Sequence, residues 1–298
     1  MPTVGRLIER VCARFEASDI TYGHGTDNAW DEAVALVLAV TALPDHEDSL
    51  AAEVAAEGAE QILAMAERRV ETRAPLAHLL GSCRYAGFEF KVDPRVIVPR
   101  SPLAFLLGEP IEALVRGDIR RVLDLCCGSG CLGIVAAHTY PDAEVTYIDL
   151  DPAAVALTEA NLASHGLAAR AHVMRADILA ADTARAFAEA PFDLILANPP
   201  YVDAADMAAL PAEYRAEPEL ALAAGEDGLD VMGPVLERLS EWLTPEGLFL
   251  GEVGASEAAL RRRYGRWPFI WPDEETMARI GGEGVFMLRS QDLARRVE

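Results

Sequence analysis

From residue 120 onward, short apolar runs of strand length alternate with longer segments of helical periodicity. Parallel strands need a crossover connection, which a helix usually supplies, so this alternation predicts βαβ units. The last two runs leave too little chain for a full helix between them, and we expect them to pair as an antiparallel hairpin. The pattern therefore predicts an α/β fold with a seven-stranded, mostly parallel sheet, whose strands are 122–125, 145–148, 171–174, 192–197, 248–253, 267–271 and 285–288.

The part of the chain before residue 101 has a different pattern. Residues 1–80 show helical periodicity without a strand signal, whereas apolar residues in 81–100 alternate by two around an Asp93-Pro94 turn. A chain of 298 residues also exceeds the usual size of one domain. We predict a helical domain at 1–80, a β-hairpin linker at 81–100 and a larger domain at 101–298.

Composition limits the possible partners. With 51% hydrophobic and 25% charged residues, the chain has ample material for a packed core, and it contains no apolar run long enough to span a membrane. The first residues also lack the apolar stretch of a signal peptide, so we expect a cytoplasmic protein without a membrane partner. The net charge of −22 disfavours nucleic acid as the direct substrate, because nucleic-acid binding depends on neutralising phosphates. The five cysteines lack zinc-site spacing, so we expect no metal.

A glycine-containing loop follows the first predicted strand. Gly128, Ser129 and Gly130 stand where the strand passes into a helix, and glycines there let a ligand approach the backbone closely. Together with Gly133 they also satisfy G-x-G-x-x-G, so a nicotinamide or flavin enzyme remains open. The carboxylate of Asp124, four residues before Gly128, would repel a pyrophosphate and suit a sulfonium amino acid. This favours S-adenosyl-L-methionine as the cofactor.

Three further residues at strand ends are candidates for binding the same cofactor. Asp149 ends the second strand, where its carboxylate can accept both hydroxyls of a ribose, which either cofactor class requires. Asp177 follows the third strand and could reach the adenine amino group, while Ile178 could pack on the ring. A surface turn is an equally good interpretation of Asp177 and Ile178.

The fourth strand runs out into the tetrapeptide Asn198-Pro199-Pro200-Tyr201. The two prolines lack backbone donors and hold the chain extended. The Asn198 side-chain oxygen and the Pro199 carbonyl can then accept the two hydrogens of an –NH2 group, and Tyr201 offers a ring face to a planar group. We therefore predict that Asn198, Pro199 and Tyr201 are catalytic. We also expect Asn198 to contact the cofactor.

An amide or aromatic amine is a poor nucleophile because its lone pair is delocalised. Two accepted hydrogen bonds would hold such a nitrogen in line with a donor methyl group and favour the charge that it gains. No strong base is needed, because the nitrogen becomes acidic only as it takes up the methyl group. The sequence predicts a methyltransferase that acts on a planar amide or amine nitrogen.

These motifs resemble the N5-glutamine methyltransferases of the HemK/Prm type, over nearly the whole chain. The resemblance is to the branch that modifies a glutamine in the third protein of the large ribosomal subunit, rather than to the release-factor branch. The release-factor branch usually has Pro-Arg-Pro-Glu-Thr where this chain has Pro99-Arg100-Ser101-Pro102. The stretches that carry the finer assignment are 23–33, 98–102 and 210–219.

The resemblance implies a Rossmann-like, class I methyltransferase fold with S-adenosyl-L-methionine bound by 124–130 and Asp149. It also implies that the substrate glutamine is bound by 198–201 and Arg100, and that the helical domain at 1–80 helps to recognise the protein substrate. One departure is Cys126-Cys127, where relatives commonly have a Thr at the second position.

Three alternatives remain open on the sequence. A DNA or RNA methyltransferase could use the same tetrapeptide on an exocyclic amino group, a release factor could be the substrate, and the chain could bind the cofactor without catalysis. Residues 201–230 carry eight acids and one arginine, which would suit a basic ribosomal protein better than a polyanion.

Overall fold

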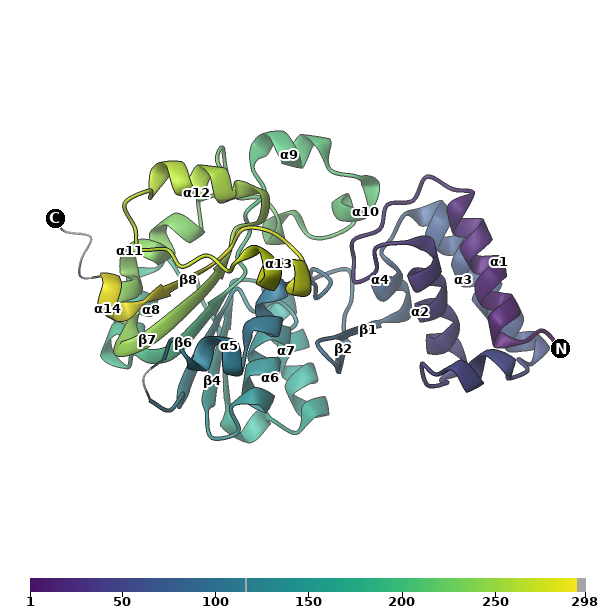
Figure 1. Cartoon of the computed structure of the whole chain (residues 1–298), viewed down its shortest axis with the longest axis horizontal. Coiled ribbons are helices and arrows are strands. Elements are labelled where there is room, and N and C mark those ends of the chain that lie inside the picture. Colours follow the sequence, from purple (N-terminus) through teal and green to yellow (C-terminus); the bar gives the residue numbers. More distant parts are fainter. Residues whose placement is uncertain (116, 294–298) are drawn as a thin grey trace.

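The computed structural model describes residues 1–115 and 117–293, which form two lobes joined by a small hairpin (Figure 1). The first lobe is helical, and its core is a single cluster of buried apolar side chains. Helix α1 contributes one apolar face to this core, because Leu7, Ile8, Val11 and Phe15 recur at helical spacing and are fully buried. The elements of this lobe are α1 (Val4–Glu16), α2 (Ala29–Thr41), the 3-10 helix η1 (Glu47–Ala51), α3 (Ala56–Thr72) and α4 (Leu76–Leu80).

The hairpin between the lobes consists of β1 (Ser82–Tyr85) and β2 (Phe88–Lys91), paired antiparallel. Its turn is at Ala86 and Gly87, with φ of 48° and 85°, so the expected position of the turn at Asp93-Pro94 was wrong. Positive φ at both central residues is the geometry of the tight two-residue loops that fit the twist of paired strands. Asp93-Pro94 forms a separate turn after the hairpin, where Val96 N–H donates to the Asp93 carbonyl at 3.2 Å.

The second lobe contains a six-stranded sheet in the described residues, not the seven strands expected from the sequence. The order is β5-β4-β3-β6-β7-β8, and all pairs are parallel except β7 with β8. The strands are β3 (Arg121–Leu125), β4 (Glu144–Asp149), β5 (Ala171–Arg175), β6 (Phe192–Ala197), β7 (Leu243–Glu252) and β8 (Val285–Arg289).

The segment 267–271 is not a strand, and the expected hairpin between the last two runs was wrong. Only Ile270 bridges to β8, through two backbone hydrogen bonds with Met287 of 2.9 and 2.8 Å. Helix α13 (Glu274–Ile280) lies between them, contrary to expectation, and begins where the Asp273 side chain accepts the Thr276 N–H at 2.8 Å. β8 instead pairs antiparallel with β7.

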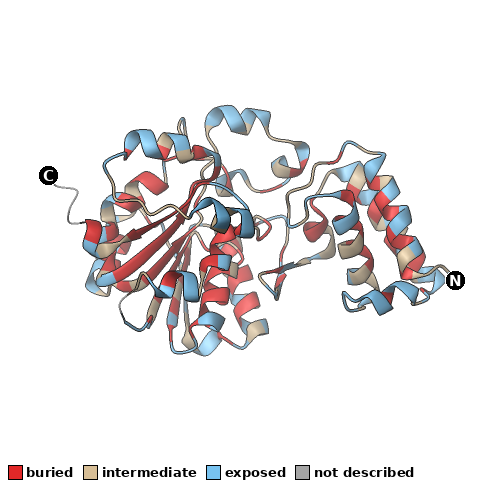
Figure 2. Ribbon diagram, in the orientation of Figure 1, coloured by how far each residue is buried: buried red, intermediate tan, exposed pale blue. Residues whose placement is uncertain are grey.

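Helices cover both faces of the sheet, and the central strands β3 and β6 are mostly buried, whereas the edge strand β5 is partly exposed (Figure 2). Successive side chains of a strand point to opposite faces. Thus Val122 packs in the cluster on one face, while Leu123 and Leu125 pack in the cluster on the other. The first face carries η2 (Pro102–Leu106), α5 (Glu109–Glu112), α6 (Cys131–Thr139), α7 (Pro152–His165) and α13, and the second carries α8 (Ala181–Glu189), α11 (Met232–Trp242), α12 (Glu257–Arg263) and α14 (Ser290–Leu293).

The connection between β6 and α11 is the longest excursion from the sheet. It contains α9 (Ala204–Ala209), α10 (Ala212–Arg215) and the 3-10 helix η4 (Glu219–Ala221), and Figure 1 shows α10 beside the helical lobe. Two further 3-10 helices are η3 (Ala168–Arg170) and η5 (Gly254–Ser256).

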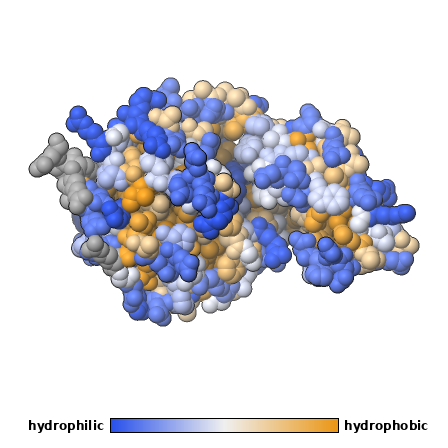
Figure 3. All heavy atoms as spheres, in the orientation of Figure 1, coloured by the Kyte–Doolittle hydropathy of each residue, from blue (hydrophilic) through white to orange (hydrophobic). Residues whose placement is uncertain are grey.

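The face of the molecule in Figure 3 carries mostly hydrophilic side chains over both lobes, with apolar ones in scattered patches. Of the helices in residues 1–115 and 117–293, none has the length and apolar character to cross a bilayer.

Candidate active site

The strand order places two loops side by side at one edge of the sheet. The chain leaves β3 toward β4 and β5 and then returns to β6 on the other side of β3. Open α/β sheets bind ligands outside the carboxyl ends of the strands at such a reversal. Leu125 and Ala197 are paired at these ends, so the glycine loop that follows β3 and the tetrapeptide that follows β6 are neighbours.

A cavity of about 290 Å³ opens between these loops. Apolar side chains form much of its wall, and carboxylates stand at the ends of β4 and β5, as a bound nucleoside would require. Seven of its lining residues are Cys126, Gly128, Asp149, Asp177, Ile178, Asn198 and Pro200, of which all but Cys126 were predicted from the sequence to bind cofactor or substrate.

Asp149 is held in place by backbone donors. Its two oxygens accept the N–H groups of Gly128 and Asp151, each at 2.9 Å. Each oxygen keeps a lone pair that can accept a further hydrogen. Burial raises the pKa of Asp149. The side chain is therefore fixed and still able to accept both hydroxyls of a ribose.

Asp177 and Ile178 lie at the same cavity. Asp177 Oδ1 accepts the Leu179 N–H at 2.8 Å, which fixes the turn after β5, and Ile178 is buried. Both interpretations of Asp177 therefore agree with its geometry, since it forms a turn and also lines the cavity.

Asp124, Ser129 and Gly130 are not among the residues that line either large cavity. Asp124 lies beneath the glycine loop and accepts the Gly133 N–H at 2.8 Å, and burial raises its pKa to about 8. The Ser129 carbonyl accepts from Asn161 at 2.9 Å, and Gly130 has a φ of 76° with no room for a Cβ against Thr158. These three residues shape the loop, so the attraction of a sulfonium by an exposed Asp124 carboxylate is not what the structure shows.

Cys126 begins the glycine loop in an unusual backbone conformation. Its φ is 57°, in the left-handed region that side chains other than Asn and Asp seldom adopt. The conformation turns the chain sharply out of β3 and brings Cys126 to the wall of the smaller cavity. Cys127 instead points inward, with Sγ 3.5 Å from the Thr158 hydroxyl.

A second, larger cavity of about 830 Å³ lies on the other side of the tetrapeptide. Its wall is built from three parts of the chain, which are the loop before α2, the hairpin region and the second lobe. Representative lining residues are Gly23 and Asp27 from the helical lobe, Arg84 and Tyr85 from β1, and Pro99, Arg100, Asn198, Pro199, Tyr201 and Glu252.

Asn198 lines both cavities, whereas Pro199 lines the larger and Pro200 the smaller. The Asn198 Oδ1 atom is buried and has no hydrogen-bond partner within residues 1–115 and 117–293. A buried acceptor without a partner is costly, so this oxygen is suited to a donor that arrives with a ligand.

Tyr201 is held on three sides by the end of β7 and the segment that follows it. Its hydroxyl donates to Glu252 Oε1 at 3.1 Å, and its carbonyl accepts from the Ser256 hydroxyl at 2.8 Å. Its ring lies against Gly254, where a Cβ would overlap the ring atoms. The ring at the larger cavity therefore has a fixed orientation.

Glu252 was not among the residues predicted from the sequence. It is only 6% exposed, lines the larger cavity, and accepts the Ser101 hydroxyl at 2.5 Å as well as that of Tyr201. Burial raises its pKa to about 7, although both hydrogen bonds oppose that rise. The available signal was an acid inside the apolar run 248–253, because charged residues in buried strands are rare without a partner.

Arg100 reaches the larger cavity, but its guanidinium already has a partner. Two of its nitrogens bond the Glu217 carboxylate at 2.7 and 2.8 Å. Glu217 also accepts the Val98 N–H at 2.8 Å and lies 3.4 Å from His24 Nε2. Although burial opposes the effect, the contacts with His24 and Arg100 lower the pKa of Glu217 to about 2.

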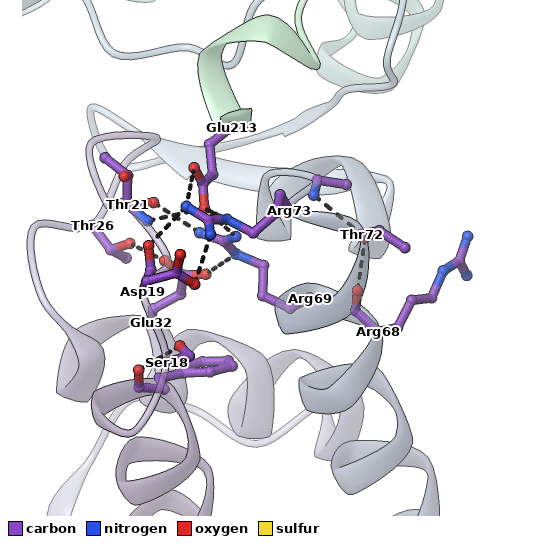
Figure 4. Close-up of polar contacts among 12 residues, drawn as sticks. Ser18, Asp19, Thr21, Thr26, Glu32, Arg68, Arg69, Thr72, Arg73 and Glu213 are labelled. Carbon is purple, nitrogen blue, oxygen red and sulfur yellow. Dashed lines mark hydrogen bonds and ion pairs between the residues drawn. The ribbon is translucent and has the colours of Figure 1, made fainter. Parts of the chain in front are cut away.

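A second buried ion-pair network joins the connection after β6 to the helical lobe (Figure 4). Glu213 of α10 points between Arg69 and Arg73 at the end of α3 and accepts from them at 3.2 and 2.6 Å. It also accepts the Thr21 N–H at 2.9 Å, while Arg69 donates to Glu32 of α2 at 2.6 Å. Glu213, Glu32 and Arg69 are all almost fully buried.

These two networks change the meaning of the acidic stretch 201–230. Glu213 and Glu217 are buried and paired within the chain, so they cannot contribute to an acidic surface for a partner. Asp206, Glu219, Glu226 and Asp230 are exposed, and Asp206 lines the larger cavity. The acidic surface is therefore smaller than the sequence suggested.

The chain is similar in sequence to known proteins. The model for the family Methyltransferase small domain matches residues 107–213. The chain is 38% identical over 300 residues to the ribosomal protein uL3 glutamine methyltransferase of Neisseria gonorrhoeae (strain ATCC 700825 / FA 1090), covering 98% of this chain and 96% of that protein. It is 38% identical over 303 residues to the protein of the same name from Burkholderia pseudomallei (strain K96243), covering 98% and 95%. A solved SAM-dependent methyltransferase from Agrobacterium tumefaciens is 20% identical, with a TM-score of 0.41 over 66% of this chain and 57% of that chain.

Proposed function

We propose that this protein transfers a methyl group from S-adenosyl-L-methionine to the side-chain amide nitrogen of a glutamine in uL3. The reason is that the chain belongs to the family of ribosomal protein uL3 glutamine methyltransferases. The observation that carries the proposal is Asn198, which lines both cavities and has a buried, unpaired Oδ1. A residue at that position can contact the cofactor on one side and the substrate on the other.

The smaller cavity fits the cofactor. Asp149 offers two fixed carboxylate oxygens to the ribose hydroxyls, and Ile178 provides an apolar surface for the adenine ring, with Asp177 beside it as an acceptor. S-adenosyl-L-methionine, when bound, supplies the methyl group. Asp124, Ser129 and Gly130 support the loop beneath it rather than contact it directly.

The larger cavity is the proposed site of the glutamine side chain. Asn198 Oδ1 accepts one amide hydrogen and the Pro199 carbonyl accepts the other, which orients the nitrogen toward the smaller cavity. The Tyr201 ring, held by Glu252, Gly254 and Ser256, provides the flat surface beside the amide plane. The same two acceptors stabilise the positive charge that develops on the nitrogen, so no residue has to remove a proton first.

Arg100 has a different role in this proposal from the one that the sequence suggested. Because Glu217 holds the guanidinium in a bidentate pair, Arg100 shapes the cavity wall and leaves the amide to Asn198 and Pro199. The proposal includes a cytoplasmic location, because the substrate is a protein of the ribosome.

The test is to incubate the purified protein with S-adenosyl-L-methionine and purified uL3, release factor or ribosomal RNA, and to analyse each by mass spectrometry. We expect an increment of one methyl group on a single glutamine-containing peptide of uL3. Modification of the release factor or of RNA in place of uL3 would contradict the proposed substrate, and the use of the same preparation in all three reactions controls for enzyme quality.

A further inference from the structure

The buried carboxylate of Glu252 receives two hydroxyl groups from different parts of the chain. Ser101, just after the linker, donates at 2.5 Å to one oxygen, and Tyr201 of the tetrapeptide donates at 3.1 Å to the other. Glu252 is the last residue of β7, and its backbone pairs with Val285 of β8. It therefore gives the Tyr201 hydroxyl a fixed position relative to the sheet.

The other contacts of Tyr201 involve its backbone and its ring, and only the contact with Glu252 involves its hydroxyl. The Ser256 hydroxyl fixes the Tyr201 carbonyl, and Gly254 supports the ring face. Neither contact determines how far the ring extends into the larger cavity. The hydrogen bond to Glu252 does, because it holds the atom farthest from the backbone.

We propose that Glu252 is a positioning residue for methyl transfer, which fixes the Tyr201 ring beside the substrate amide and is itself oriented by the Ser101 hydroxyl. The inference rests on the proposed function, since it assigns Glu252 and Ser101 to the glutamine site of that same reaction. It connects the segment after the hairpin to the tetrapeptide through two hydrogen bonds.

The arrangement requires an ionised carboxylate. An ionised Glu252 accepts on both oxygens, whereas a protonated one carries a hydrogen on one oxygen and no longer accepts equally from both hydroxyls. The titratable and charged groups around it are Tyr201, Tyr85 and Arg100, with Glu283 on the wall of the same cavity. Because burial raises the pKa of Glu252 to about 7, transfer should increase as the pH rises through this value.

The first experiment compares wild type with Glu252→Gln, measuring methyl transfer to uL3 across this pH range and the Kd for S-adenosyl-L-methionine by calorimetry. We expect kcat to fall about 10- to 100-fold, as misplacement of a contact group typically causes, with the cofactor Kd unchanged. The rise with pH should also disappear, because glutamine does not titrate. A Glu252→Gln profile that still rises like that of wild type would overturn the inference.

Two hydroxyl deletions test the chain of contacts even if Glu252→Gln folds poorly. Ser101→Ala and Tyr201→Phe each remove a hydrogen bond that lowers the pKa of Glu252, so each should move the midpoint of the pH profile upward. Ser164→Ala removes an exposed hydroxyl that bonds only its own helix at Ala160, and it should leave the midpoint unchanged. Unmoved midpoints in both test variants would contradict the assignment.

A double-mutant cycle separates positioning through Tyr201 from a general structural effect. If Glu252 acts through the tyrosine hydroxyl, Glu252→Gln should cost far less in a Tyr201→Phe background than in wild type. Equal costs in both backgrounds would overturn the inference alone. Absence of uL3 methylation by the wild-type protein would instead overturn the proposed function, and the inference with it.

Discussion

The side-chain oxygen of Asn198 is buried and has no partner in the described residues, which makes this residue the centre of the proposed site. Leaving a buried acceptor unsatisfied costs about 1–3 kcal/mol. The cost is tolerated at functional sites, where a substrate donor completes the hydrogen bond. Single residues of this kind can be tested without disturbing the sheet.

Asn198→Ala should abolish methyl transfer, because it removes one of the two acceptors that orient the substrate nitrogen. The Kd for S-adenosyl-L-methionine should change by only several-fold, since Asp149, Asp177 and Ile178 remain in the smaller cavity. Calorimetry and a transfer assay with uL3 measure the two effects separately. Near-normal turnover by this variant would show that the two-acceptor description is wrong.

Asp149→Ala should have the opposite signature. It removes the carboxylate that is fixed by Gly128 and Asp151, and we expect the Kd for the cofactor to rise about 10- to 100-fold, or about 1.4–2.8 kcal/mol. Asp182→Ala is the control, because this exposed carboxylate accepts the Thr183 N–H and lines neither cavity. Equal losses in the two variants would contradict the assignment of Asp149 to the ribose.

At the level of elements, the connection after β6 is tied to both neighbouring regions by buried glutamates. Glu213 of α10 binds the end of α3, and Glu217 binds the segment that follows the hairpin. Removing one partner from a buried pair leaves the other charge uncompensated, which is more costly than losing an exposed pair.

Glu213→Ala should destabilise the protein by about 1.5–3 kcal/mol, because the buried Arg69 would lose this hydrogen-bonded partner and keep Glu32 as its carboxylate partner. Glu67→Ala, which removes the exposed pair with Arg14, should cost far less, because solvent screens an exposed ion pair. Urea unfolding followed by circular dichroism measures both. A similar cost for the two variants would mean that Glu213 contributes no more than a surface pair.

The same glutamates predict how stability depends on pH. The pKa of each is about 2 in the folded protein, below the value of about 4.3 for an unfolded chain. Their contribution is therefore complete above about pH 4.3 and is lost as the pH falls toward 2. The free energy of unfolding should decrease over this window in wild type and decrease less in the double variant Glu213→Gln, Glu217→Gln. An identical slope in both proteins would contradict the ion-pair assignment.

The elements of the second lobe were largely predictable because apolar runs and helical periodicity report directly on burial. The exceptions have local causes. The turn at Ala86-Gly87 was missed because alanine seldom adopts a positive φ, and Asp93-Pro94 was the more obvious turn signal. The run 267–271 is apolar like a strand, and its side chains Phe269 and Trp271 pack on Phe286. However, only Ile270 forms backbone hydrogen bonds to β8.

The candidate site was predictable only where a motif marks it. The tetrapeptide, Asp149, Asp177 and Ile178 were candidates from the sequence, and they line the cavities; their binding roles remain predictions. Glu252 and Ser101 were missed because their contact joins residues that are distant in sequence, and no local spacing encodes it. Asp124 was assigned to the right loop, but a sequence cannot show that its carboxylate points into the protein rather than toward the ligand.

At the scale of the whole molecule, the important feature is that residues of both lobes line the larger cavity. Asp27 of the helical lobe and Asp206 of the connection line it, and both are exposed acids. If the larger cavity holds the glutamine, as proposed above, a protein substrate is expected to contact the helical lobe while its glutamine lies in the second lobe. Ribosomal proteins are typically basic, so these carboxylates should favour the encounter.

Asp27→Lys should raise the KM for uL3 about 3- to 10-fold, as expected for a charge at the rim of an interface, with kcat and the cofactor Kd unchanged. Glu9→Lys is the matched control, since it reverses an exposed acid on α1 of the same lobe that does not line the cavity. Steady-state kinetics at low and high salt would measure both. An equal rise in KM for the control would indicate a general effect of net charge.

The unpaired Asn198 oxygen also bears on how many times one nitrogen can be modified. Glutamine presents two amide hydrogens, and its methylated product presents only one. If that nitrogen entered the site again, either Asn198 Oδ1 or the Pro199 carbonyl would face a methyl group instead of a donor, at the cost of a buried unsatisfied acceptor. The architecture therefore favours a single methylation, so the dimethylated amide should not accumulate even during long incubation.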